Sequence, residues 1–218
     1  MSERLAVLGD VHCNAPALEA VLAAVAAAGI QNGLCTGDLV LRGLEPEACV
    51  ARLASLGWPA VQGNTDRKVA ERPAGNRAGK GPPRPGSRSW TRLRLSEASV
   101  RYLAGLPPSL RLRLGRWRVL LTHGRPDDPT AVLADLDTPA AELERLASEL
   151  DADCVVFGHT HRPMLRSAGG CLFLNPGSVG EGTWDAPYPR WAWLLAADDG
   201  LSAGIERVEA PLAPPRAT

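Results

Sequence analysis

All four histidines of this chain lie at or just beyond the ends of short apolar runs, together with two aspartates and one asparagine. Imidazole nitrogens combined with carboxylate and amide oxygens suit a divalent metal such as Mn, Fe, Zn or Ni. The seven residues are Asp10, His12, Asp38, Asn64, His123, His159 and His161. Seven ligands are too many for one tetrahedral site. They suit two metals roughly 3.5–4 Å apart that share a bridging carboxylate.

Each part of this set taken alone also has a purely structural explanation. An Asp-x-His pair can be a turn followed by a helix N-cap, and Gly-Asp or Gly-Asn is a common turn dipeptide. The run His159-Thr160-His161 is more specific, because two imidazoles two residues apart in a turn can serve neighbouring metals. The metal hypothesis therefore requires that all seven side chains meet at one place.

The chain that carries these residues begins as short strands alternating with helices. Helices are predicted at 15–28 and 46–56, each with a proline in its first turn and a glycine just after its end. Strands are predicted at 4–8, 34–36 and 58–62. This alternation predicts a largely parallel sheet, whose functional groups lie beyond the carboxyl ends of its strands.

The rest of the chain is predicted to add helices at 96–106 and 140–150, hairpins at 110–122 and 164–174, and strands at 154–157, 191–195 and 201–208. Residues 67–94 hold nine basic residues and one acid, with many prolines and glycines, and predict a flexible basic loop. The Pro-rich tail at 211–218 is expected to be frayed. We expect a single domain over residues 1–210.

Composition limits the classes of partner. The 218 residues include 24 basic and 24 acidic ones, so zero net charge gives no general attraction to nucleic acid or anionic lipid. The longest apolar run has about half the length that a membrane-spanning helix requires, and the apolar run near the N-terminus is too short for a signal peptide. Five scattered cysteines favour reduced thiols. We therefore expect a cytoplasmic protein with no membrane partner.

Taken in order, the motifs resemble those of the calcineurin-like metallophosphoesterases. The pattern runs Asp10-x-His12, Gly37-Asp38, Gly63-Asn64-Thr65-Asp66, His123-Gly124 and Gly158-His159-x-His161. The resemblance extends from about Leu5 to Ser178, and its final Asn-Pro-Gly-Ser is similar to the small bacterial phosphodiesterase branch. It implies an α/β fold, a four-layer αββα sandwich with two mixed β-sheets flanked by helices.

The resemblance also implies a ligand set. Asp10, His12, Asp38 and His161 would hold one metal, and Asp38, Asn64, His123 and His159 the other, with Asp38 bridging. Manganese is favoured, with Fe, Ni, Zn or Mg as alternatives, and Asp38, Asn64 and His123 are the expected catalytic residues. Water held between the two metals would become hydroxide near neutral pH and attack phosphorus in line.

Thr65 is the main departure from the family pattern. Many members have a histidine there, thought to protonate the leaving group, and threonine is a poor proton donor. We therefore favour phosphodiester substrates, with a phosphomonoesterase acting on a nucleotide or phosphoprotein as the alternative. Candidate substrate-binding residues are Thr65, Arg42 and Arg67, the arginines as clamps on phosphate oxygens. Cys13, where glycine is common, is either a bystander or an oxidation-sensitive neighbour.

Three other interpretations compete with this one. Asp151-x-Asp153-x-Val155 matches a short haloacid-dehalogenase signature, but both acids precede the apolar run instead of following it. A non-catalytic interaction scaffold of the same fold would have lost ligand types that this chain keeps. The basic loop at 67–94 could follow a polynucleotide, but its only aromatic residue is Trp90, so a solvated loop is favoured. Sequence leaves the natural substrate and the oligomeric state open.

Overall fold

The computed structural model describes residues 3–72, 82–182 and 187–209. The predicted tail at 211–218 and part of the predicted basic loop lie outside these residues. Within them, no helix combines the length and the hydropathy that a membrane-spanning helix requires.

The first sheet has the strand order β2-β1-β8-β9. Its strands are β1 (Glu3–Leu8), β2 (Gly33–Cys35), β8 (Arg190–Ala196) and β9 (Leu201–Arg207). β1 pairs with β2 in parallel, and the other neighbours are antiparallel. The sheet is therefore mixed, and the late strands β8 and β9 complete it from the far end of the chain.

The second sheet has the order β3-β4-β5-β7-β6. Its strands are β3 (Ser109–Leu114), β4 (Trp117–Thr122), β5 (Cys154–Val156), β6 (Met164–Ala168) and β7 (Cys171–Asn175). The inner pairs β4–β5 and β5–β7 are parallel, and the two predicted hairpins flank them. Both sheets agree with the predicted mixed α/β architecture.

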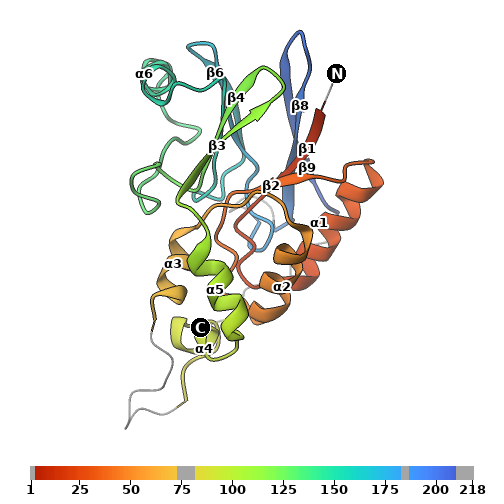
Figure 1. The fold of residues 1–218 in the computed structure, drawn as a ribbon, viewed down its shortest axis with the longest axis vertical. Coiled ribbons are helices and arrows are strands. Elements are labelled where there is room, and N and C mark those ends of the chain that lie inside the picture. The colour runs from red at the N-terminus through yellow and green to blue at the C-terminus, as the bar shows by residue number, and fades with distance from the viewer. Residues whose placement is uncertain (1–2, 73–81, 183–186, 210–218) are drawn as a thin grey trace.

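Side chains that alternate along each strand build the layers. In β1, Leu5 and Val7 pack into the core between the sheets, and Ala6 and Leu8 pack under the helices. The helices on that side are α1 (Ala15–Ala27), α2 (Pro46–Leu56) and α5 (Glu97–Gly105). Helix α6 (Ala140–Leu150) covers the outer face of the second sheet, where it packs on Val155 (Figure 1). The result is the predicted four-layer αββα sandwich.

The predicted strand at 58–62 is wrong, since only a single bridge joins Ala60 to Cys35. Pro59 has no N–H to give to a ladder. Two backbone hydrogen bonds flank the bridge, from the Cys35 N–H to the carbonyl oxygen of Pro59 and from the Val61 N–H to that of Cys35, and the Gln62 N–H then donates to the carbonyl oxygen of Pro107. A three-residue β2 therefore leaves this segment as an extended edge.

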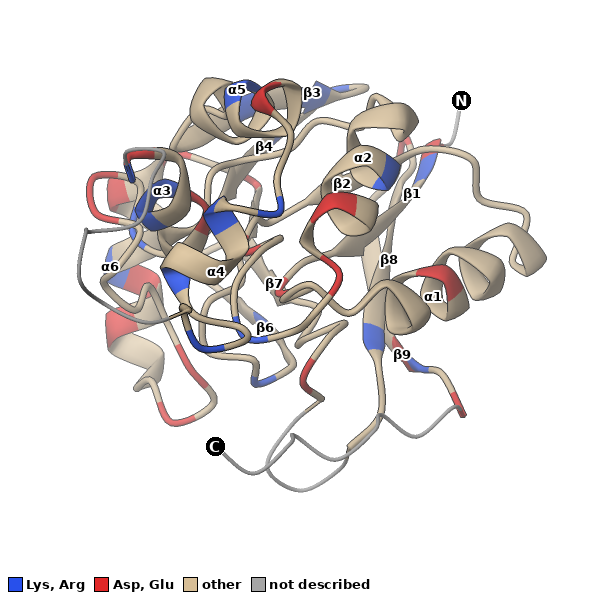
Figure 2. Cartoon of the chain, turned by 90° about the horizontal axis from the view of Figure 1, so that it is seen from below, with Lys and Arg blue, Asp and Glu red and all other residues tan. Residues whose placement is uncertain are grey.

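The basic segment also differs from the predicted loop, because it is helical at both ends. Helix α3 (Asn64–Ala70) is capped by Asp66 and buries Val69, and α4 (Arg88–Arg92) begins at Ser87, whose hydroxyl accepts the Trp90 N–H. Figure 2 shows basic residues on both helices. Trp90 is buried with the Arg94 guanidinium 3.8 Å from its ring centroid, so it offers no face to a nucleic-acid base.

Candidate metal centre

The structure brings all seven predicted ligands to one end of the sandwich, where strands of both sheets end. Asp10 and His12 follow β1, Asp38 follows β2, and His123 follows β4. His159 and His161 follow β5, and Asn64 is the first residue of α3. Strands from both sheets therefore contribute, so the site exists only when the two sheets are packed together.

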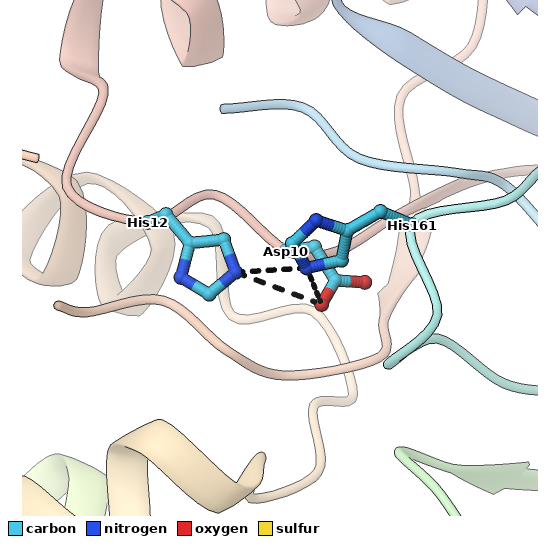
Figure 3. Close-up of side chains that lie close together, drawn as sticks. All are labelled: Asp10, His12 and His161. Carbon is cyan, nitrogen blue, oxygen red and sulfur yellow. Dashed lines mark hydrogen bonds and ion pairs between the residues drawn. The ribbon is translucent and has the colours of Figure 1, made fainter. Parts of the chain in front are cut away.

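The first group is Asp10, His12 and His161 (Figure 3). Nε2 of His12 and Nε2 of His161 lie 3.0 Å apart, and Oδ1 of Asp10 lies 3.2 Å from the His161 nitrogen and 3.9 Å from the His12 nitrogen. Asp10 Oδ1 is buried and has no hydrogen-bond partner among the described residues. A cation bound beside this buried carboxylate oxygen would supply the partner that no hydrogen-bond donor supplies.

The second group surrounds Asn64. Its Oδ1 lies 3.1 Å from Nε2 of His123 and 3.1 Å from Nδ1 of His159, and these two nitrogens lie 3.2 Å apart. Asp38 connects the groups, because Oδ2 lies 3.8 Å from His12 Nε2 and Oδ1 lies 3.4 Å from His123 Nε2. One carboxylate oxygen therefore faces each group, as a bridging ligand requires.

These spacings fit ligands of divalent ions. With metal–ligand bonds of about 2.1 Å, two ligands on one ion lie about 3.0 Å apart in octahedral and about 3.4 Å apart in tetrahedral geometry. The separations within each group run from 3.0 to 3.9 Å. The 3.0 Å contact between the two Nε2 atoms is a hydrogen bond when one of these nitrogens carries a proton, and a bound cation would take the place of that proton.

Backbone carbonyls fix the orientation of two of the imidazoles. Nδ1 of His123 donates to the carbonyl oxygen of Thr36 at 2.8 Å, and Nδ1 of His12 donates to that of Val40 at 3.3 Å. In both rings the proton therefore lies on the outer nitrogen, and the Nε2 lone pair faces the centre. This arrangement prepares both side chains to act as ligands.

The backbone around the centre is strained. Five of the seven candidates have φ in the left-handed region: Asp10 (52°), His12 (47°), Asp38 (54°), His159 (75°) and His161 (58°). Such conformations are uncommon outside glycine and concentrate at functional sites. Three of the five motifs therefore hold their candidate ligands in a backbone conformation that is tolerated where the position of the side chain matters.

Glycines next to the ligands are required by close packing. A Cβ at Gly63 would lie 2.1 Å from Oδ1 of Asp38, and one at Gly158 would lie 2.8 Å from Oδ2 of Asp10. No other residue type fits at these positions without displacing a candidate ligand. The Gly-Asn and Gly-His dipeptides of the sequence thus reflect contact between motifs as well as turn formation.

The contact between Asp10 and His161 shifts the pKa values of these two residues in opposite directions. Burial acts to raise the pKa of Asp10, but the neighbouring imidazoles, His161 foremost, lower it to about 2. Burial acts to lower the pKa of His161, but contacts with Asp10 and Glu181 raise it to about 10. Burial lowers the pKa of His12 and His159. A cation that replaces the proton on His161 would meet the same acidic surroundings.

Two residues of the centre were missed as site residues. Asp66 is completely buried, and its carboxylate accepts N–H groups of Asp38, Leu39 and Gly63 at 2.8–3.0 Å. Glu181 lies 3.3 Å from Nδ1 of His161. Asp66 stands in the Gly-Asn motif and could have been found by its spacing. Glu181 has no local signal, because only tertiary packing places it beside His161.

The three predicted substrate-binding residues have different surroundings. Thr65 is buried and its hydroxyl donates to the carbonyl oxygen of Val40 at 2.8 Å, so this proton is directed at the backbone. Arg42 forms an ion pair with Glu181. Arg67 lies one turn beyond Asn64 on α3 and makes no ion pair within the described part of the chain.

Two further sequence interpretations have structural outcomes. Cys13 is fully buried, and burial raises the pKa of its thiol, which favours the bystander interpretation. Asp151 and Asp153 pair with Arg118 at the amino end of β5, whereas His159 follows its carboxyl end. The haloacid-dehalogenase signature is therefore far from the strand end that such an enzyme would use.

Comparisons with known proteins agree with this geometry. The family model that describes the calcineurin-like phosphoesterase superfamily domain matches residues 4–198 of this chain. MJ0912 of Methanocaldococcus jannaschii is 27% identical over 177 residues, which cover 80% of this chain and 69% of that protein. Phosphodiesterase YfcE of Escherichia coli (strain K12) is 25% identical over 186 residues, 81% of this chain and 79% of that one.

A crystal structure of a metallophosphoesterase from Sphaerobacter thermophilus has the same fold. It matches with a TM-score of 0.75 and 26% identity, over 94% of this chain and 88% of that chain. The family match spans most of the sequence and includes every segment that carries a candidate ligand. The chain therefore belongs to the calcineurin-like phosphoesterase superfamily.

Proposed function

We propose that this protein is a metal-dependent phosphodiesterase whose centre holds two divalent ions, with manganese favoured. The observation that carries the proposal is the meeting of seven imidazole, carboxylate and amide groups at ligand spacing, from segments of both sheets. The relationship to YfcE, which is called a phosphodiesterase, supports the same reaction class. The family in general supports a hydrolase of phosphate esters.

The distances support the two sets of ligands that the family resemblance implies. Asp10, His12, Asp38 and His161 would hold one ion, and Asp38, Asn64, His123 and His159 the other, with one Asp38 oxygen toward each. Bound there, the ions would lower the pKa of a water molecule that they hold and would neutralise negative charge on the phosphate. The retained ligand set disfavours a non-catalytic scaffold.

The chain itself orients these groups. The Thr65 N–H donates to Oδ1 of Asp38 at 2.8 Å, which fixes the carboxylate between the two groups. The carbonyls of Thr36 and Val40 hold the rings of His123 and His12. Arg67, which lies on the same helix as Asn64 and makes no ion pair within 4 Å among the described residues, is the better candidate for binding a non-bridging phosphate oxygen.

The preference for diesters rests on the residue at position 65. Its hydroxyl hydrogen bonds to the backbone, so it offers no proton to a leaving alkoxide. Monoesters with poor leaving groups depend most on such a proton. We therefore favour phosphodiesters as substrates, with water or another acid protonating the leaving oxygen.

Hydrolysis of bis-(p-nitrophenyl) phosphate and of p-nitrophenyl phosphate, each with and without Mn²⁺, tests the proposal. We expect Mn²⁺-dependent turnover with a higher kcat/KM for the diester, and its loss in Asp38→Asn. The exposed Asp127 provides the control Asp127→Asn, which should keep wild-type turnover. Faster cleavage of p-nitrophenyl phosphate than of the diester would favour the phosphomonoesterase, and no metal-dependent turnover on either ester would favour the scaffold.

A further inference from the structure

The outer nitrogens of the candidate ligands are held in two different ways. For His12 and His123 the acceptor is a backbone carbonyl, as described above. For His161 the group that faces Nδ1 is a side chain, because Oε2 of Glu181 lies 3.3 Å away. Nε2 of the same ring faces Oδ1 of Asp10 at 3.2 Å. The carboxylate of Glu181 therefore occupies the place that a carbonyl oxygen takes at the other two histidines.

We propose that Glu181 is a positioning residue of the metal centre, which accepts the Nδ1–H of His161 and thereby increases the affinity of the centre for a divalent ion. The inference rests on the proposed function, since it takes His161 as a ligand. Carboxylate–histidine pairs of this kind fix the tautomer and the ring orientation and make the ligating nitrogen more basic.

The loop that carries Glu181 is attached to the loop that carries Asp10. The Ser178 hydroxyl donates to the carbonyl oxygen of Asp10 at 2.8 Å, and the Glu181 N–H donates back to the Ser178 hydroxyl at 3.0 Å. The Gly180 N–H also donates to the Asp10 carbonyl, at 3.0 Å. A Cβ at Gly180 would lie 1.9 Å from the carbonyl oxygen of Val11, so the two loops are in direct contact. Glu181 is thus held in place by the same backbone that positions Asp10.

Arg42 limits the freedom of the Glu181 carboxylate. Its guanidinium pairs with Oε2, the oxygen that faces His161, and it reaches this position from the loop that follows Asp38. The pair joins two loops that are 139 residues apart in sequence. Because the guanidinium and the imidazole share one carboxylate oxygen, Arg42 restricts how the carboxylate can turn relative to the imidazole. Arg42 then acts on the ligand through Glu181, and a role in phosphate binding is not needed to explain its position.

Metal binding to the stripped full-length protein tests the proposal without using activity. Titration calorimetry with Mn²⁺ would compare wild type, Glu181→Gln and Glu181→Ala. We expect Glu181→Ala to weaken binding about 10- to 100-fold with unchanged stoichiometry. Glu181→Gln retains an oxygen that can accept the Nδ1–H, so its loss should be smaller. The matched control is Glu19→Gln, which removes one partner of the exposed ion pair with Arg52 between α1 and α2 and should change nothing.

The outcomes separate this inference from the proposed function. Wild-type Mn²⁺ affinity in Glu181→Ala would overturn the positioning role and leave the two-metal proposal intact. Loss of one bound ion at saturating Mn²⁺ would also overturn it, because Glu181 would then be a ligand itself. Absence of Mn²⁺ binding by the wild type would end both. Thermal melting of the metal-free proteins verifies that the variants fold.

Discussion

Replacing Asp66 by alanine should destabilise the protein more than any single exposed carboxylate can. Its Oδ1 accepts the N–H groups of Leu39 (2.8 Å) and Val40 (3.3 Å), and its Oδ2 accepts those of Asp38 (2.9 Å) and Gly63 (3.0 Å). The residue has no exposed surface, so these donors would lose their acceptor inside the protein.

The magnitude follows from the number of donors. Each buried donor left without an acceptor costs about 1–3 kcal/mol, and water that enters the cavity recovers part of this. Burial and the charge of Asp38 raise the pKa of Asp66 to about 7, so removing the carboxylate also relieves some repulsion. We therefore expect a net loss of about 3–5 kcal/mol in the free energy of unfolding. Asp66→Asn keeps one acceptor oxygen for two of the four donors and should lose about half as much.

Urea unfolding in the presence of a chelator measures this loss without a contribution from bound metal. With a slope of about 3 kcal/mol per molar urea, the midpoint of Asp66→Ala should fall by about 1–1.7 M. The control Asp127→Ala removes a side chain that is 80% exposed and should stay within about 0.5 kcal/mol of wild type. A loss below about 1 kcal/mol for Asp66→Ala would refute the reasoning, because it would mean that the four N–H groups find other acceptors at little cost.

The remaining predictions concern the metal centre, the thiols and one link between helices. His161→Ala or Asp38→Asn should abolish turnover and reduce bound metal measured by elemental analysis, with the circular dichroism spectrum kept; full activity in both would exclude the two-metal assignment. Mn²⁺ at 100 times its Kd should stabilise the wild type by about 2.7 kcal/mol for each bound ion, seen as a rise in Tm that chelation reverses and that Asp38→Asn lacks. All five cysteines are buried, so a disulfide-exchange reagent should label them only on unfolding, and rapid labelling of Cys13 would contradict this. Glu47 accepts hydrogen bonds from Ser96 at 2.9 Å and from the Ser99 hydroxyl at 3.0 Å; partial burial acts to raise its pKa, but these bonds lower it below the usual 4.5. Glu47→Ala should therefore lower Tm by roughly 2–8 °C near neutral pH, and because the stabilisation is lost as pH falls below about 4.5, the difference from wild type should shrink toward pH 3.

Local signals in the sequence determined most of the fold. Helices α1 and α2 each have a proline at one of their first two positions and a glycine within two residues of their end, and both were predicted to within a residue. The apolar runs predicted β1, β5 and both hairpins, because their side chains are buried on alternating or on both faces. The family and its four-layer architecture were predicted from motifs that each need only a few adjacent residues.

The sequence also indicated which residues meet at the centre, since each candidate ligand lies one to five residues beyond a strand end or begins a helix. Parallel strands end at the same edge of a sheet, so the position of a residue along its own strand places its side chain there. This holds for Asp10 and Asp38, which follow the paired parallel strands β1 and β2, whereas His123 comes from the second sheet.

Tertiary structure alone decided what surrounds those ligands. His12 and His161 are 149 residues apart in sequence, and Arg42 and Glu181 are 139 apart, so no local pattern couples them. No local pattern predicts the single bridge of the 58–62 segment either, because its pairing depends on the short length of β2. Helix α4 also depends on tertiary contacts, since it buries Trp90. Helix caps and strand ends arise from forces within a few residues, whereas the partner of a carboxylate depends on which loops the packing of two sheets brings together.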